Sequence, residues 1–142
     1  MASEFEDLQP IAALMEERAL ARHRDMLVQE DALRRELDEI ENLRHRSLRQ
    51  DDQAHARRML GADGVWQNWL AQRRLRLTQE LAVLQVRKAE TLAAAQTAFA
   101  RHQVTADLAA DDREVQRRRN FTLAERRLEE DWQTSVSASK GY

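Results

Sequence analysis

The chain has 142 residues, the size of one domain and too few for two. Its 23 basic and 25 acidic residues nearly cancel, so no excess of positive charge draws it to nucleic acid or to acidic membranes. Three glycines and one proline are too few for a turn-rich β fold, and the absence of cysteine excludes disulfides and thiolate metal sites. The abundance of Ala, Leu, Arg, Glu and Gln indicates a helical protein rather than a disordered one.

The residues that interrupt helices gather at three points of the chain. They are Pro10 near the start, Gly61 and Gly64 in the middle, and a serine-rich stretch at the end. The sequence between them is continuously compatible with helix. It predicts one helix over about 10–60, a turn at 61–64, a second helix over about 64–135, and a flexible tail at 136–142.

The ends of these helices carry capping residues. Ser3 followed by Glu6 matches a capping box, whereas a start at Asp7 would put Pro10 in the first turn, and both starts stay open. Gly61 suits the left-handed residue that follows a helix, and Asp63 suits the cap of the next one.

Apolar residues on the predicted first helix recur at a step of seven. A turn at 61–64 would place Ile40 opposite Leu84 and Leu33 opposite Leu92, so apolar residues meet across the two helices. Neither polar helix is stable alone, so the apolar stripes must pair. We therefore predict an all-α fold: a single domain formed by a long antiparallel two-helix coiled-coil hairpin, with the second helix longer than the first.

Residues for catalysis and metal binding are not grouped in the sequence. No histidine has another histidine three or four residues away, and the chain has no phosphate-binding loop. The run Arg117–Arg119 has Glu114 within one turn, which argues against a nucleic-acid surface. We expect no enzyme activity, no catalytic or metal-binding residues and no cofactor. The acidic start and the lack of a long apolar run predict a cytoplasmic chain without direct membrane insertion.

Large apolar residues remain at both ends of the predicted hairpin. Two of them have a local explanation: Trp66 could pack on Met59 and Leu60, and Phe121 on Phe5. The other explanation is contact with partners. The open end offers Phe5, Leu8, Ile11, Phe121, Leu128 and Trp132, and the tip offers Trp66, Trp69, Leu70, Arg73 and Arg74.

The stretch from Gly61 to Leu70 (GADGVWQNWL) lies between a helix of about fifty residues and one of about seventy. In turn position, helix sizes and the tryptophan after the turn, the chain resembles the FliJ/YscO family. These proteins are the central stalks of type III secretion systems, both those of flagella and those of virulence. The resemblance implies an antiparallel coiled coil whose open end enters the hexameric ring of the export ATPase. It also implies that the tip reaches the cytoplasmic region of the export gate, a membrane protein.

Carried onto this chain, the resemblance implies two contact sets. The ATPase-binding end would be Phe5, Leu8, Ile11, Val115, Phe121, Leu128 and Trp132, and the gate-binding tip Trp66, Trp69, Leu70, Arg73, Arg74 and Leu77. The protein would be a non-enzymatic coupling factor in the cytoplasm, peripherally associated with the secretion apparatus at the inner membrane. Export substrates or chaperones are further partners that the resemblance suggests.

Two other functions stay open at this point. The chain could be a generic coiled-coil structural adaptor that dimerises through an alanine-rich stripe (Ala93, Ala94, Ala95 and Ala98). It could also be an escort chaperone that holds export substrates with its exposed apolar ends.

Overall fold

The computed structural model describes residues 3–49 and 61–141. They form two helices, α1 (Glu4–Arg49, 46 residues) and α3 (Ala62–Ser139, 78 residues). No strand occurs among these described residues. The fold is the predicted antiparallel two-helix coiled-coil hairpin, and its second helix is the longer one.

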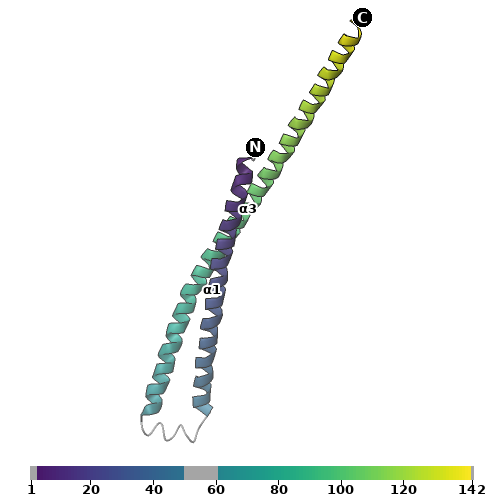
Figure 1. The fold of residues 1–142 in the computed structure, drawn as a ribbon. Helices are drawn as coiled ribbons and strands as arrows, with labels where there is room; N and C mark the ends of the chain where they lie inside the picture. Colours follow the sequence, from purple (N-terminus) through teal and green to yellow (C-terminus); the bar gives the residue numbers. More distant parts are fainter. Residues whose placement is uncertain (1–2, 50–60, 142) are drawn as a thin grey trace. The chain divides into compact units, whose positions relative to one another are not determined.

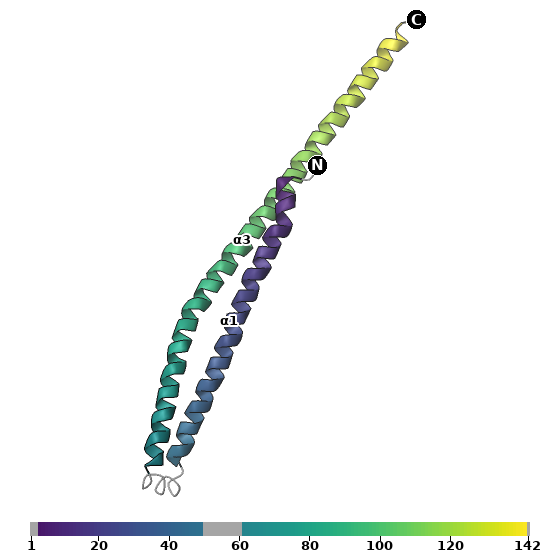
Figure 2. The ribbon, with the colours of Figure 1, turned by 60° about the vertical axis from the view of Figure 1, so that its left-hand side comes forward.

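The chain divides into two compact units, and each contains part of both helices. The central unit comprises the described residues of 17–97, and the terminal unit comprises residues 3–16 and 98–141. Within each unit a stretch of α1 lies beside a stretch of α3 and runs in the opposite direction (Figures 1 and 2).

Helix α1 begins at Glu4, earlier than the expected start at about residue 10. Ser3 is the cap: its Oγ accepts the Glu6 backbone N–H at 3.2 Å, as the capping-box alternative required. Acidic residues in the first turn offset the helix dipole. Pro10 therefore lies inside the helix, where it leaves the Glu6 carbonyl without its usual N–H donor.

The start of α3 also differs from the prediction. Gly61 has a φ of 72°, the left-handed conformation expected of it, but the helix begins directly afterwards at Ala62. Residues 62–64 are therefore helical rather than part of a turn, and Asp63 stands in the first turn instead of capping it. At the other end α3 continues to Ser139, so residues 136–139 belong to the helix and not to a tail. The predicted end of the first helix, over 50–60, lies outside the described residues.

The core of the central unit is one cluster of branched aliphatic side chains. Ile40, Leu70 and Leu77 are buried together, and Leu33 and Leu37 pack against them. The members on each helix are spaced by three, four or seven residues, which keeps them on one face of a two-helix coiled coil. Leu84 is buried farther along the same face of α3.

The alignment of the two helices differs from the predicted one. Lys88 pairs with Glu30, where the predicted turn would have put Ala95, and Ile40 clusters with Leu70 and Leu77 rather than with Leu84 alone. Lys88 precedes Ala95 by seven residues, one full heptad. A heptad pattern matches itself after such a shift, so the apolar spacing alone could not distinguish the two alignments.

In the terminal unit the seam is made of smaller and more polar residues. Ala109 is fully buried, and His102 and Glu16 contact one another across the helices. Arg113 pairs with Glu6 at 3.5 Å. Beyond that pair α3 continues past the start of α1, as the position of the N label shows (Figure 1).

Candidate interaction surfaces

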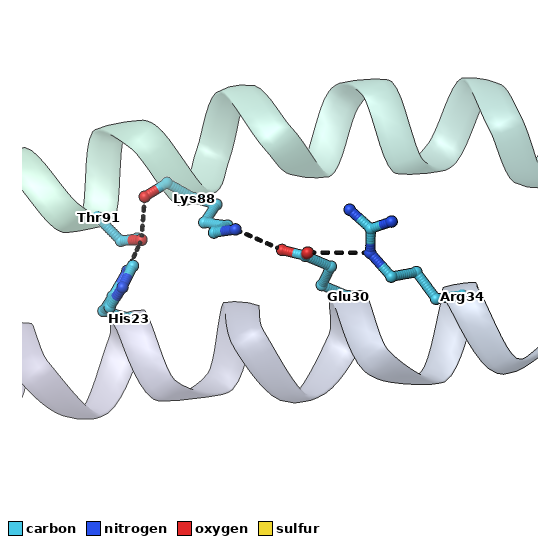
Figure 3. Close-up of polar contacts among 5 residues, drawn as sticks. All are labelled: His23, Glu30, Arg34, Lys88 and Thr91. Carbon is cyan, nitrogen blue, oxygen red and sulfur yellow. Dashed lines mark hydrogen bonds and ion pairs between the residues drawn. The ribbon is translucent and has the colours of Figure 1, made fainter.

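Polar side chains occupy several seam positions of the central unit. Figure 3 shows the most buried group, in which Glu30 forms an ion pair with Lys88 Nζ at 2.8 Å and accepts from Arg34 Nε at 3.0 Å. Glu30 is 9% exposed, so its carboxylate is largely withdrawn from water. A buried carboxylate requires such cationic partners, because its charge is otherwise costly to desolvate.

The environment of Glu30 lowers the pKa of its carboxyl group. The hydrogen bond from Lys88 holds the pKa of this carboxyl below its ordinary value of 4.5, and the bond from Arg34 acts in the same direction. Burial opposes this shift but does not cancel it. Glu30 is therefore ionised in the folded hairpin at neutral pH.

A hydrogen bond between His23 and Thr91 lies beside this ion pair. The Thr91 hydroxyl donates to the Lys88 carbonyl at 3.0 Å, so it accepts from His23 Nδ1 at 3.0 Å (Figure 3). His23 Nδ1 is therefore the donor in this hydrogen bond. The Ser47 hydroxyl makes the same two kinds of hydrogen bond. It donates to the Arg44 carbonyl and accepts from Gln67 Nε2 at 2.5 Å.

Two tryptophans form an exposed aromatic patch near the start of α3. The rings of Trp66 and Trp69 are stacked, with centroids 5.4 Å apart and planes 13° from parallel. Trp69 is 50% exposed, and Trp66 and Val65 are exposed as well. The proposed packing of Trp66 on Met59 and Leu60 falls outside the described residues. An exposed stacked pair is a rigid apolar surface suited to a protein contact.

The other four residues predicted for the tip do not belong to this exposed apolar patch. Leu70 and Leu77 are each 1% exposed and belong to the hairpin core, which corrects their assignment to a partner surface. Arg73 pairs with Glu36 at 2.8 Å and Arg74 with Glu41 at 2.5 Å, both across the two helices. These arginines therefore contribute to hairpin pairing.

The terminal unit exposes a long stretch of α3. Every residue from 115 to 135 is exposed, and no described part of α1 covers this stretch. We call it the uncovered segment. Its ordered contacts are local: Glu114 accepts from Arg117 and Arg118 one turn away, and the Thr122 hydroxyl donates to the Arg118 carbonyl. An isolated helix held by such contacts alone is only marginally stable in water.

Apolar residues on the uncovered segment lie at helical spacing. Phe121, Leu128 and Trp132 are 67%, 70% and 68% exposed, and they follow one another at seven and four residues, which places them on one side of the helix. Phe121 is thus not covered by Phe5, so this local explanation fails. Val115, Leu8 and Ile11 are also exposed, whereas Phe5 is half-buried.

The alanine-rich stripe is partly used within the hairpin. Ala95 is buried and Ala98 half-buried, whereas Ala93 and Ala94 are exposed.

Two further kinds of site are absent from residues 3–49 and 61–141. No three histidine or acidic residues are grouped there as metal ligands would be. Neither α1 nor α3 contains, in its described length, a segment long and apolar enough to cross a membrane.

Comparison of the chain with protein-family models, with curated proteins and with solved structures gave no match. The interpretation of its surfaces therefore depends on their own chemistry.

Sequence reasoning missed the polar side of the seam. Glu16, His23 and Glu30 recur at seven-residue spacing, and each contacts a polar group on α3. Their common spacing is a signal visible in the sequence, at the same seven-residue step that the apolar residues follow.

Proposed function

We propose that the chain is the central stalk of a type III protein export ATPase complex. In this proposal the terminal unit inserts its uncovered segment into the hexameric ATPase ring, and the tryptophan patch reaches the cytoplasmic region of the export gate. The chain would act in the cytoplasm, at the secretion apparatus of a flagellar or a virulence system. The resemblance to the FliJ/YscO family supplies the partners.

The observation that carries the proposal is the uncovered segment. A marginally stable helix that exposes Phe121, Leu128 and Trp132 on one side gains most by burial against another protein. Its polar sides suit the wetter rim of such an interface. A single asymmetric helix inside a six-fold ring cannot contact all subunits equally, so it would bias the order in which they hydrolyse ATP.

The test uses the full chain and the purified export ATPase encoded with it. The proposal predicts binding to the ATPase hexamer and an increase of its ATP hydrolysis rate. Phe121→Ala with Trp132→Ala should weaken binding at least about tenfold, since each large buried contact contributes about 1 kcal/mol or more. Val86→Ala is a matched control, because Val86 is equally exposed but lies in the central unit.

Other outcomes point to the two alternatives. A stable dimer with no effect on the ATPase would favour a structural adaptor. Capture of several export substrates without the ATPase would favour an escort chaperone. If the unaltered chain neither binds the ATPase hexamer nor increases its rate of ATP hydrolysis, the stalk function is excluded.

A further inference from the structure

We infer that the polar pairs of the seam are a register lock, which selects one alignment of α1 against α3 among several that the apolar residues accept. The lock consists of Glu30 with Lys88 in the central unit and Glu16 with His102 in the terminal unit. It is a property of the chain itself and does not rest on the proposed function.

The apolar residues accept more than one alignment. In the observed one, Ile40 packs with Leu70 and Leu77. If α3 slid by one heptad in either direction, Ile40 would still face leucines, Leu84 in one case and Leu70 in the other. Leucine recurs at this spacing in α3, so the burial of Ile40 changes little with the alignment.

The polar residues would lose their partners on the other helix in the shifted alignments. With α3 shifted one way, Glu30 would face Ala95 and Lys88 would face Leu37. With the opposite shift, Glu30 would face Leu81. In each case a carboxylate that is now largely buried would lose Lys88, its cross-helix cation, and keep only Arg34 on its own helix. A buried charge that loses a partner costs more than a surface pair that is broken.

The terminal unit repeats this arrangement. Glu16 and His102 are both half-buried, and the seam residues around them are uncharged: Ala12, Ala98, Thr105 and Ala109. A shift by one heptad would put Glu16 opposite Ala109, or His102 opposite Gln9. Because the seam here is formed mainly by alanine and threonine, its apolar burial gives little preference for one alignment. The polar pair therefore has the larger share in selecting it.

The alignment decides how much of α3 extends beyond α1 in the terminal unit. A slip of one heptad moves α3 by about 10 Å relative to α1, since the helix rises 1.5 Å per residue. Such a slip would cover or expose two further turns of α3 next to Val115. The lock thus sets the length of the uncovered segment.

Cysteine pairs can report the alignment, because the chain has no cysteine of its own. Ala12→Cys with Thr105→Cys should form a disulfide in the observed alignment. Ala12→Cys with Asp112→Cys, or with Ala98→Cys, reports the two shifted alignments. All four positions are half-buried seam positions of the terminal unit.

The lock is removed by four leucine substitutions: Glu16→Leu, His102→Leu, Glu30→Leu and Lys88→Leu. We expect disulfide formation by the two shifted pairs to rise at least about tenfold over the chain with the lock intact, with helicity by circular dichroism unchanged. The control replaces Glu36 and Arg73 by leucine. That pair also crosses the helices, but it is exposed and stays solvated in any alignment, so the shifted pairs should not respond.

A charge exchange tests the lock without apolar substitutions. Glu30→Lys alone puts two lysines together and should raise the shifted disulfides. Glu30→Lys with Lys88→Glu restores an ion pair and should return them to the original level. The inference is wrong if, in the four-leucine variant and in Glu30→Lys, a disulfide forms only between the cysteines at positions 12 and 105. The polar pairs would then not select the register.

Discussion

The central and terminal units use the same two helices but differ in what their seams bury. The central unit buries Ile40, Leu70, Leu77 and Leu84, whereas the terminal unit buries Ala109 beside a half-buried polar pair. Several of its large apolar residues, Phe121 and Trp132 among them, lie on the uncovered segment. The difference indicates that the central unit holds the hairpin together, while large apolar side chains of the terminal unit remain exposed.

The largest expected effect is in the central core. Leu77→Ala should lower the free energy of unfolding by about 2–4 kcal/mol, because it removes a fully buried side chain from a core of few residues. Chemical denaturation followed by circular dichroism measures it. Leu75→Ala is the control: Leu75 lies on the same helix but is exposed, and its loss should change stability by less than about 0.5 kcal/mol. Equal effects of the two variants would show that the core is not where the structure has it.

The next effect concerns the start of α1 in the terminal unit. Pro10→Ala should stabilise the hairpin by about 1–2 kcal/mol, because it restores a backbone donor to the Glu6 carbonyl inside the helix. A rise of the thermal midpoint by several degrees is expected. Destabilisation by this substitution would mean that the first turns of α1 are not helical in solution.

A smaller effect is expected at Gly61. Gly61→Ala should cost about 1 kcal/mol, because an L-residue disfavours the left-handed conformation found there. Apart from the chain neighbours of Gly61, no atom of residues 3–49 and 61–141 lies within 4 Å of the added Cβ, so the cost there is conformational. Gly64→Ala is the matched control, since Gly64 is helical and alanine should stabilise that position.

The pH dependence of the central unit follows from Glu30. Its pKa is lowered in the folded state, so its contribution to stability is complete above the unfolded value of 4.5 and is lost as pH falls through the lower folded value. Denaturation between pH 7 and pH 3 should show the stability advantage over Glu30→Gln shrinking toward acid. A constant difference between the two proteins over this range would contradict the ion pair with Lys88.

The smallest effect on stability is expected in the uncovered segment. Phe121→Ala with Trp132→Ala should change the free energy of unfolding by less than about 0.5 kcal/mol, because both side chains are already exposed. A large loss in the isolated protein would mean that these residues pack within the chain.

The hairpin itself could be predicted because helix breakers are so few, and the left-handed Gly61 followed from its place between two helical stretches. The start of α1 could not be fixed, since Pro10 fits a first turn as well as a tolerated interior position. The register was missed because heptads repeat every seven residues, so the apolar spacing is the same in each alignment, whereas Glu30 meets Lys88 and Glu16 meets His102 in the observed one. The assignment of Leu70 and Leu77 to a partner surface followed from their place near the tip and from the family resemblance, and neither of these tells which side of α3 faces α1.

The central claim is that the uncovered segment, rather than the hairpin core, binds the export ATPase. The chain has three tryptophans, so Trp66→Phe with Trp69→Phe leaves Trp132 as its single reporter. After subtraction of the ATPase's own emission, adding the hexamer should shift Trp132 fluorescence to shorter wavelength, because the ring buries it. The complementary Trp132→Phe protein should show no such shift. An unchanged Trp132 emission under conditions where the chain stimulates the ATPase would contradict the account.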